Sequence, residues 1–326
     1  MEEEPRRIIV ARTDRIGDVV LSLPVFASLK KCFPKSEVIA LVREDTADVA
    51  ASFHAVDRSI IYDPEESLGS TAKKLREADA DAILTLFPRF PIAASAVAAG
   101  IPVRVGTAYR WYSFLFNRRV HEHRKDSVKS EAEYNLSLAE AIGCHKKIMD
   151  ITLEPDAGAA ERVKLFLKEN VQDRYIVVHP GSGGSARAWP ETRFRILLET
   201  ISRDLDIIVL VTGSQAERGL CERVSTGIRG VVNVAGQFYL KEFMALLKDA
   251  EVFVSNSTGP IHLSAAVGTP VVGIYPNNKP MTPKRWAPIT ERKLILTPKD
   301  GSDEVDRISS EEVMRSILEL TSVKAK

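Results

Sequence analysis

The chain has 326 residues, with 45 Lys and Arg against 44 Asp and Glu, and 44% of its residues are hydrophobic. This length suits two domains, and the nearly balanced charge gives no reason to expect nucleic acid as a partner. The N-terminus lacks the apolar run of a secretory signal, and no apolar stretch reaches the length that crosses a bilayer. We therefore expect a cytoplasmic protein, with room for peripheral contact with a membrane from that side.

The cysteines are few and far apart. Cys32, Cys144 and Cys221 form no CxxC pair and have no metal-binding spacing with His. We interpret them as buried small residues in a reducing compartment.

Short β-rich runs alternate with helical patterns along the whole chain, which is typical of parallel α/β architecture. In the first half we expect strands at 6–12, 37–42, 59–63, 81–87 and 103–107, with helices at 21–33 and 69–78. In the second half we expect strands at 174–181, 206–213, 231–236, 251–257, 270–276 and 293–297, with helices at 190–204 and 239–250. A capped amphipathic helix is expected within 309–326.

The two series meet at a polar segment containing Pro and Gly, residues 152–159, which is a candidate linker. The predicted fold class is α/β, with two Rossmann-like domains facing a central cleft. The predicted domains are residues 1–152 and 153–302, followed by a C-terminal segment, 303–326. Ligands of such sheets bind beyond the carboxyl ends of the strands, so the strand-to-helix turns carry the candidate chemistry.

The first such turn is RTDRIGDVVLSLP, in which Gly17 and Asp18 follow the first strand. A carboxylate at the carboxyl end of a strand can take a proton from a substrate. The alternative is that Asp18 only favours the helix N-terminus through the helix dipole.

Two turns of the second half are rich in small residues. In HPGSGGSARAWP, the loop 181–184 offers N–H groups that can cradle phosphate oxygens, and Arg187 adds a fixed positive charge. The pattern is not that of a P-loop, and a simple flexible turn is the alternative. In VTGSQAERG, Glu217 follows Gly213 and can bind ribose hydroxyls, although a surface glutamate near a helix start explains it equally.

The stretch SNSTGPIHLSAA, residues 255–266, predicts a strand, a tight loop and a helix N-terminus, with N-cap residues followed by Pro260. Such a terminus points free N–H groups at an anion. His262 lies one turn into this helix and is either part of the site or an ordinary core histidine.

Two absences narrow the chemistry. No G-x-G-x-x-G follows the first strand, which argues against an NAD dehydrogenase. Asp79 and Asp81 form a DxD pattern that runs directly into an apolar strand, so we interpret it as a strand entry and not as a metal site. We expect no metal and no cofactor.

A basic segment with interleaved aromatic residues spans 104–129. Its Arg and Lys residues suit an anionic, partly lipidic acceptor, with the aromatics touching the interface. A solvated loop beside a core helix is the alternative. The residues concerned are Arg104, Arg110, Trp111, Tyr112, Phe114, Phe116, Arg118, Arg119, Arg124, Lys125 and Lys129.

With RTDRIGDVVLSLPVFASLKKCFP, HPGSGGSARAWPETRF and SNSTGPIHLSAAVGTPVVGIYP in this order, the chain resembles the ADP-heptose:lipopolysaccharide heptosyltransferase family, glycosyltransferase family 9, over nearly its whole length. The resemblance implies the GT-B fold, with an acceptor-binding first domain and a nucleotide-sugar-binding second domain. It also implies a C-terminal helix that crosses back to the first domain and a metal-independent, inverting transfer.

The resemblance implies a role for particular residues. Asp18 matches the catalytic base, and Arg187 stands where the family has Lys and offsets charge on the departing diphosphate. Ser257 replaces an Asp that many members have, so the identity of the sugar stays open. The predicted donor-binding residues are Gly181, Ser182, Gly183, Gly213, Glu217, Ser257, Thr258, Gly259 and His262. The predicted acceptor-binding residues are Arg15, Gly17, Arg110, Arg118 and Arg119.

The resulting prediction is a heptosyltransferase that moves a heptose from ADP-heptose to a lipid A-Kdo type acceptor in the lipopolysaccharide inner core. Its partners would be the nucleotide sugar, a lipid-linked anionic saccharide and the cytoplasmic face of the inner membrane. A nucleotide-sugar epimerase or hydrolase of the same fold, or a non-catalytic nucleotide-sugar binding protein, remains as an alternative. The base preference of the donor is open, as is the oligomeric state.

Overall fold

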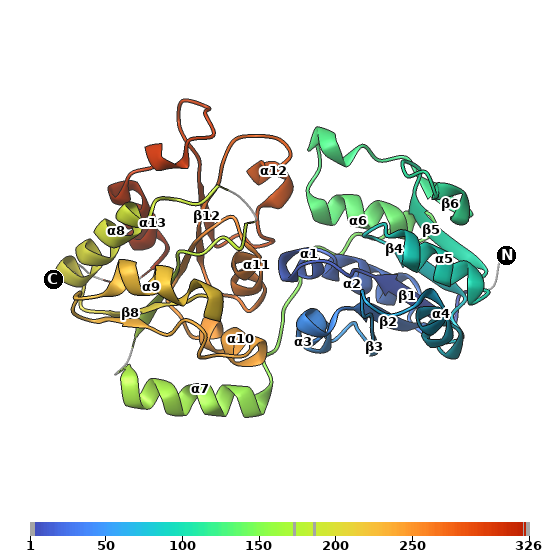
Figure 1. The fold of residues 1–326 in the computed structure, drawn as a ribbon, viewed down its shortest axis with the longest axis horizontal. Helices are drawn as coiled ribbons and strands as arrows, with labels where there is room; N and C mark the ends of the chain where they lie inside the picture. The colour runs from blue at the N-terminus through green and yellow to red at the C-terminus, as the bar shows by residue number, and fades with distance from the viewer. Residues whose placement is uncertain (1–3, 172–173, 185–186, 322, 324–326) are drawn as a thin grey trace. The chain divides into compact units, whose positions relative to one another are not determined.

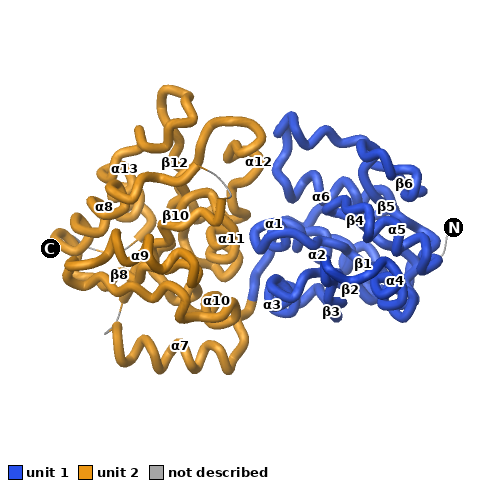
Figure 2. The backbone as a smooth tube through the Cα atoms, viewed as in Figure 1, with its two compact units in different colours: residues 1–153 blue, residues 154–326 orange. Residues whose placement is uncertain are grey.

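The computed structural model describes residues 4–171, 174–184, 187–321 and 323. It divides into two compact units, residues 1–153 and 154–326 (Figure 2). Each unit contains one six-stranded sheet with helices packed around it (Figure 1). The predicted α/β class with two Rossmann-like units is confirmed.

The first unit has the strand order β3-β2-β1-β4-β5-β6, and all of its strand pairs are parallel. Its strands are β1 (Arg7–Ala11), β2 (Glu37–Val42), β3 (Arg58–Ile61), β4 (Ala82–Thr85), β5 (Val103–Thr107) and β6 (Arg118–Val120). Its α-helices are α1 (Ile16–Val20), α2 (Leu23–Cys32), α3 (Ala47–Ala51), α4 (Leu68–Glu77), α5 (Phe90–Ala98) and α6 (Glu131–Glu140).

The second unit has the order β12-β11-β10-β7-β8-β9, again with parallel pairs throughout. Its strands are β7 (Tyr175–His179), β8 (Ile208–Val211), β9 (Val231–Asn233), β10 (Phe253–Asn256), β11 (Val271–Ile274) and β12 (Lys293–Leu296). Its α-helices are α7 (Ala157–Asn170), α8 (Glu191–Asp204), α9 (Arg218–Ser225), α10 (Leu240–Lys248), α11 (Gly259–Ala266), α12 (Pro283–Trp286) and α13 (Ser310–Leu320).

The central strands are mostly apolar and almost wholly buried because helices cover both faces of each sheet. In β1 the residues Ile8 to Ala11 are fully buried, and in β7 every residue is buried. The weak strand β6 was not predicted, because its three residues, RRV, carry two arginines and read as part of the basic segment. The predicted linker is shorter than expected, since Asp156 caps α7 through a hydrogen bond from the Ala159 N–H.

The two sheets share one topology. In each, the first strand of the unit lies in the interior, and the chain builds outward on one side before it crosses to the other. This reversal falls between β1 and β4 in the first unit, and between β7 and β10 in the second. Ligands of open α/β sheets bind at such reversals, beyond the carboxyl ends of the strands. The turns that the sequence singles out after β1, β7 and β10 therefore lie at the reversal of their own sheet.

The C-terminal helix differs from the prediction that it crosses back to the first domain. Helix α13 packs on α8 and on β11 and β12, all in its own unit. Its apolar face, with Val313, Met314 and Ile317, belongs to the hydrophobic core of that unit. Ser309 and Glu312 form a capping box at its start. The physical reason is that the second sheet leaves an apolar face beside α8, and α13 covers it.

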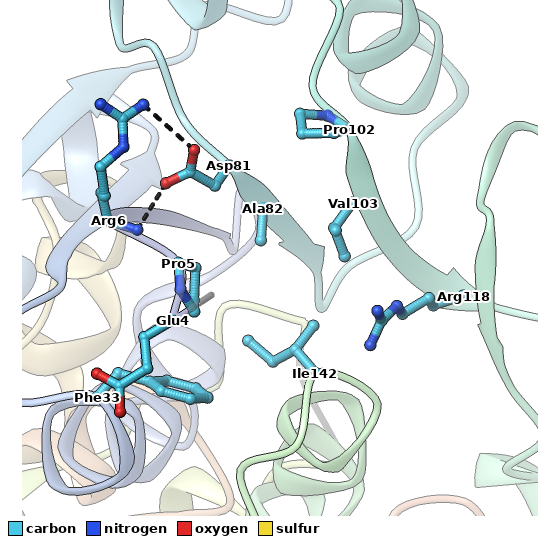
Figure 3. Close-up of a pocket in the computed structure, with 10 residues that line it drawn as sticks. All are labelled: Glu4, Pro5, Arg6, Phe33, Asp81, Ala82, Pro102, Val103, Arg118 and Ile142. Carbon is cyan, nitrogen blue, oxygen red and sulfur yellow. Dashed lines mark hydrogen bonds and ion pairs between the residues drawn. The ribbon is translucent and has the colours of Figure 1, made fainter. Parts of the chain in front are cut away.

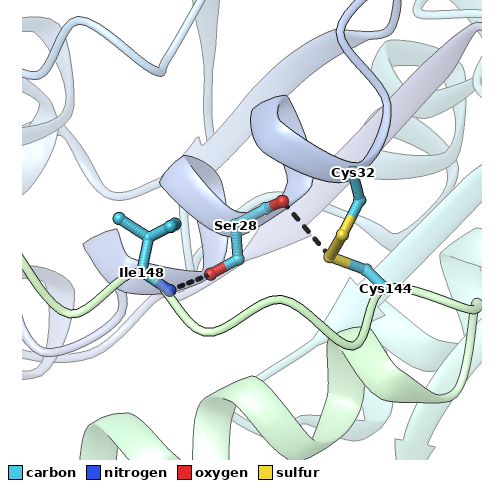
Figure 4. The surroundings of a disulfide bond; sticks show 4 residues. All are labelled: Ser28, Cys32, Cys144 and Ile148. Atoms are coloured by element: carbon cyan, nitrogen blue, oxygen red, sulfur yellow. Dashed lines mark hydrogen bonds between the residues drawn. A yellow bond between two sulfur atoms is a disulfide. The ribbon is translucent and has the colours of Figure 1, made fainter.

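The prediction of three reduced cysteines is also corrected. Cys32, at the end of α2, forms a disulfide with Cys144, and their Cα atoms are 5.5 Å apart (Figure 4). The Ser28 carbonyl oxygen lies 3.2 Å from the Cys144 Sγ, and the Ser28 hydroxyl accepts a hydrogen bond from the Ile148 N–H. The sequence could not show this pairing, because 112 residues separate the two cysteines. Cys221 is free and buried, as expected.

Candidate functional site

In the first unit, the turn after β1 brings Asp18 to the reversal point of the sheet. The strand ends at Ala11, four residues follow in irregular conformation, and the short helix α1 begins at Ile16 with Asp18 in its first turn. The hydroxyls of Thr13 and Thr85 are buried without a protein partner among the described residues. Because Thr85 ends the neighbouring strand β4, these unsatisfied hydroxyls lie at the same edge of the sheet as Asp18.

Arg12 is the centre of this turn, although it was predicted only as the last residue of the first strand. It is 2% exposed, and its Nε is 2.7 Å from Asp14 Oδ1 while its Nη2 is 2.5 Å from Asp18 Oδ1. Its Nη1 donates to Glu131 Oε1 and to Asn135 Oδ1, at 3.1 Å each. Burial alone would lower the pKa of Arg12, but the surrounding carboxylates outweigh it and raise the pKa.

Two of the carboxylates that contact this guanidinium, those of Asp14 and Glu131, have different surroundings. Burial raises the pKa of the Asp14 carboxyl to about 6, even though Arg12 favours the charged form. Glu131, on α6, is buried and also contacts the Arg124 Nη1 at 2.5 Å. A chain of charged contacts thus runs from the basic segment to Asp18, through Glu131 and Arg12.

The predicted acceptor residues do not all gather at this edge. Gly17 is part of α1 beside Asp18, and Arg15, directly before it, is exposed. Arg110 is exposed in the turn after the carboxyl end of β5. The positions of these three residues fit an acceptor site at this edge of the sheet. Their contact with an acceptor stays a prediction.

Arg118 is a correction. Its Nη1 donates to the Ala141 carbonyl, and its side chain lines a cavity of about 350 Å³ with Arg6, Asp81 and Pro102 (Figure 3). Those residues stand at the amino ends of β1, β4 and β5, so Arg118 lies at the edge of the sheet opposite Asp18. Arg119 is exposed, and its Nε donates to the nearby Phe116 carbonyl. Both were predicted to bind the acceptor as part of the basic segment, because the sequence did not reveal β6.

The aromatic residues of the basic segment divide into two groups. Tyr112 and Phe116 are buried, and the Tyr112 hydroxyl donates to the Pro88 carbonyl. Trp111 and Phe114 are 73% and 65% exposed, and the Trp111 ring stacks on Phe90 with their centroids 5.1 Å apart. The exposed pair, close in sequence to the exposed Arg110, is a surface feature that the fold of the unit does not require.

In the second unit, the predicted helix start is present. Helix α11 begins at Gly259, directly after Thr258 as N-cap, and Pro260 is in its first turn. The Thr258 side chain makes no capping hydrogen bond, and its hydroxyl is buried without a partner among the described residues. The first N–H groups of a helix have no partner within the helix. An unsatisfied hydroxyl and free N–H groups at one helix start are what an anion would use.

Asn256 ties this helix start to the glycine-rich loop, a role that the sequence analysis did not recognise. Its Oδ1 accepts from the Trp189 N–H at 2.8 Å, and its Nδ2 donates to the Pro180 carbonyl at 2.8 Å. The side chain is fully buried. The loops after β7 and β10, which flank the reversal of the sheet, are thereby held together. Its position at the end of a buried strand, where a polar residue is unusual, was the available signal.

Glu217 connects the glycine-rich loop to the turn after β8, which begins with Gly213. Its carboxylate accepts from the Gly183 N–H at 3.3 Å and from the Ser214 N–H at 2.9 Å. A Cβ on Gly181 would lie 2.1 Å from Glu217 Oε1, so only glycine allows this approach. Burial raises the pKa of Glu217, but the hydrogen bonds from Ser214 outweigh it and lower the pKa. Glu217 thus connects two loops through hydrogen bonds from the Gly183 and Ser214 N–H groups. Its contact with ribose stays a prediction.

Ser257 and His262 are both buried beside the helix start. Ser257 hydrogen-bonds with the hydroxyl of Tyr275, whose pKa burial raises. Burial lowers the pKa of His262 to about 4, so its imidazole is neutral at pH 7. Its Nδ1 has no partner among the described residues. His262 therefore adds no positive charge to an anion site, although it can still offer a hydrogen bond.

Arg187 stands apart from these residues. Its side chain is 57% exposed, and its Nη2 lies 3.8 Å from Asp306 Oδ1, which makes a weak ion pair. Ser182, in the glycine-rich loop, is half-buried. The structure brings together the loops that carry Gly181, Gly183 and Thr258, and it leaves Arg187 at the surface.

The described residues contain no group of three or more His, Cys, Asp and Glu side chains arranged to hold a metal ion. Among the same residues, no helix combines the length and the apolar character needed to pass through a membrane.

Comparison with known proteins agrees with this architecture. A Haemophilus influenzae protein that bears a provisional glycosyltransferase name is 29% identical over 313 residues, covering 91% of this chain and 90% of that protein. The structure of the family 9 glycosyl transferase from Veillonella parvula superposes with a TM-score of 0.87 at 20% identity, over 98% of both chains. Escherichia coli ADP-heptose lps heptosyltransferase II gives 0.81 at 19% identity, over 96% of this chain and 98% of that one.

The two Rossmann-like units, with candidate loops at each reversal, have the GT-B fold. Residues 68–314 match the model of glycosyltransferase family 9 (heptosyltransferase). The chain belongs to that family.

Proposed function

We propose that this protein transfers a heptose from ADP-heptose to the lipopolysaccharide inner core, without a metal ion and with inversion at the anomeric carbon. The observation that carries the proposal is the start of α11, where the buried Thr258 hydroxyl lacks a partner in the described part of the chain and Asn256 links the helix to the glycine-rich loop. The E. coli protein of the same fold, named for ADP-heptose and lipopolysaccharide, supports the choice of donor and acceptor.

The diphosphate of the donor would lie at this helix start. The free N–H groups of α11 and of the glycine-rich loop would bind its oxygens, with the Thr258 hydroxyl as a further donor. Arg187 would turn from its weak contact with Asp306 toward the leaving phosphate, since a 3.8 Å surface ion pair restrains it little. Fixed donors at the developing charge of the leaving group are a large source of rate acceleration.

Asp18 would act as the general base. The acceptor hydroxyl oxygen attacks the anomeric carbon, its proton passes to the Asp18 carboxylate, and the bond from the anomeric carbon to the phosphate oxygen breaks. ADP leaves with the electron pair of that bond, and attack from the opposite face inverts the anomeric centre. Base assistance of this kind is worth about 10²- to 10⁴-fold in rate.

The acceptor would approach over the exposed surface of the first unit. Its anionic groups would meet Arg15 and Arg110, while Trp111 and Phe114 would reach the lipid or the headgroup boundary. The protein would then work from the cytoplasmic face of the inner membrane. A lipid-linked substrate explains why two large aromatic side chains remain exposed beside arginines.

Calorimetric titration with ADP, ADP-heptose, UDP and GDP in EDTA tests the donor assignment. We expect ADP and ADP-heptose to bind selectively and Thr258→Val to weaken ADP about tenfold, the effect of one hydrogen bond to a charged group. Thr200→Val, on the outer helix α8, is the matched control and should leave affinity unchanged. Preference for UDP or GDP would reassign the donor, and binding of no nucleotide would refute the proposal.

A further inference from the structure

The guanidinium of Arg12 has a protein acceptor at each of its three nitrogens. Asp14 and Asp18 accept from Nε and Nη2, and Glu131 and Asn135 both accept from Nη1. The guanidinium is planar and its N–H groups form a fixed fork, so the direction of each acceptor determines the direction of the others. A lysine at this position could not reach four acceptors on three sides.

Helix α1 is a weak frame for a base by itself. It has five residues, and none of the side chains that the structure describes caps its N-terminus. Isolated helices of this length are marginal, because nucleation is costly and few hydrogen bonds follow. The orientation of the Asp18 carboxylate must therefore be fixed from outside the helix.

Helix α6 supplies that outside anchor. It has ten residues and a complete capping box of Ser130 and Glu133. Its Glu131 and Asn135 lie one turn apart, and both are buried and accept from Arg12 and from Arg124. The Asn135 Nδ2 also donates to the Leu21 carbonyl, just after α1. The anchor thus holds both the guanidinium and the end of the short helix.

We propose that Arg12 is the positioning residue of the base: held by Glu131 and Asn135 of α6, it fixes the direction of the Asp18 carboxylate and supplies the cation that pairs with it. This inference rests on the proposed function, in which Asp18 accepts the proton. Arg12 does not touch substrate in this scheme and acts through Asp18.

The charges around Arg12 determine in which direction the acidic limb of the pH profile of kcat should move in each variant, and this direction tests the inference. The charged groups facing it are Asp14 from the turn, Asp18 from α1 and Glu131 from α6, with Arg124 beyond Glu131. Loss of the Arg12 cation disfavours the charged form of Asp18, whereas loss of the Glu131 anion favours it. A merely structural role gives no reason for opposite shifts.

The experiment measures transfer and its pH profile for Arg12→Gln, Arg12→Lys and Glu131→Gln. We expect Arg12→Gln to move the acidic limb of kcat up by about one pH unit, and Glu131→Gln to move it down by about half a unit. Arg12→Lys, which keeps the charge, should lower kcat about 100-fold through lost orientation while the KM for the donor changes less than about twofold. The control is Arg104→Lys, because Arg104 also makes several hydrogen bonds, to the Leu115 and Ile101 carbonyls, but contacts no carboxylate of this cluster.

Shifts of the same sign in Arg12→Gln and Glu131→Gln, or a kcat in Arg12→Lys no lower than in Arg104→Lys, would overturn the inference. If Arg12→Gln does not fold, the comparison of kcat between Arg12→Lys, which keeps the charge, and Arg104→Lys decides the inference. A carbon-13 titration of the Asp18 carboxyl, assigned with Asp18→Asn, follows the same shifts without turnover. Absence of transfer in the wild-type protein would refute the proposed function, and the carboxyl titration would still decide the role of Arg12.

Discussion

The two units share one strand order but use the reversal of their sheets in opposite ways. In the first unit the turn after β1 contains several charged residues, and the Arg12 guanidinium forms ion pairs with the carboxylates of Asp14 and Asp18. In the second unit the glycine-rich loop 181–184 and the turn after β10 carry small, uncharged residues, and the Thr258 hydroxyl has no partner among the described residues. Under the proposed function, the first turn would hold the carboxylate of the base, and the other turns would leave donors for an incoming anion.

The same topology therefore does not determine the chemistry at its reversal. In the first unit, charge–charge contacts fix side chains before any ligand arrives. In the second, Asn256 and Glu217 fix the backbone of the loops, and it is the backbone that would meet the ligand. Changes in the first unit should act on turnover, and changes in the second on donor affinity and on the stability of the loops.

The largest effect is expected for Asp18→Asn. Without a base the acceptor hydroxyl keeps its proton, so kcat should fall by about 10²- to 10⁴-fold. The affinity for ADP, measured by calorimetry, should stay within about twofold, because Asp18 belongs to the first unit. The control is Asp45→Asn, at an exposed carboxylate of the same unit. Transfer that survives in Asp18→Asn with little loss would exclude Asp18 as the base.

A second difference concerns the pH dependence of stability. The pKa of Asp14 is raised to about 6 in the folded protein, mainly by burial. An unfolded aspartate has a pKa of about 3.9, so the stabilising effect of its proton is complete below about pH 4 and disappears as the pH rises through about 6. A shift of about two units corresponds to about 3 kcal/mol.

Asp14→Asn should remove this dependence. The free energy of unfolding of the variant, relative to wild type, should rise by about 3 kcal/mol between pH 4 and pH 7. His179 and His262, whose pKa values burial lowers to about 4, change stability in the opposite direction in both proteins and cancel in the difference. Urea unfolding of both proteins at several pH values measures this difference in the free energy of unfolding. A difference that does not change with pH would contradict a raised pKa of the Asp14 carboxyl in the folded protein.

In the second unit, Asn256→Ala should destabilise the protein by about 2 kcal/mol. It leaves the Trp189 N–H and the Pro180 carbonyl buried without their partner. The affinity for ADP should fall as well, because the two loops lose their connection. Asn170→Ala, at an exposed side chain that bonds only its own helix, serves as control. A loss of stability with unchanged ADP affinity would separate Asn256 from the donor site.

Arg187→Ala should weaken ADP-heptose and lower kcat, each by about tenfold, the effect of one charge-assisted contact. The free energy of unfolding should change by less than about 0.5 kcal/mol, since the side chain is exposed. Arg195→Ala, at an exposed arginine of α8, is the matched control. Unchanged kinetics in Arg187→Ala would place it outside the site, where the structure now has it.

The sequence predicts the fold of this protein well because its information is local. Eleven of the twelve strands follow from apolar runs bounded by turn residues, and β6 is missed because its residues are RRV. The turns that carry the candidate site residues can also be predicted, from the ends of the strands and from the small residues that follow them. The predictions that fail concern contacts between distant segments, such as the disulfide of Cys32 with Cys144 and the packing of α13 on α8.

The candidate site shows the same limit. Asp18 and Thr258 were recognisable from a turn and a helix start. Arg12 was not, because its partners Glu131 and Asn135 lie on a helix more than 100 residues away. Asn256 was recognised only as a capping residue, since its bonds to Trp189 and Pro180 also cross the chain. Arg118 was misplaced because a basic run gives no indication of which edge of a sheet each side chain will reach.

The smallest expected effect separates two arginines that the sequence treats alike. Arg110 stands after the carboxyl end of β5, whereas Arg118 lines the cavity at the amino ends of the strands. Arg110→Glu should therefore raise the KM for acceptor several-fold, and Arg118→Glu should leave it within about twofold, with the KM for donor unchanged in both. Steady-state kinetics at two salt concentrations measures this, and added salt should reduce the difference, because exposed charges are screened. An equal rise in both variants would mean that acceptor binding does not distinguish the two edges of the sheet, and the acceptor surface would then have to be sought away from the Asp18 edge.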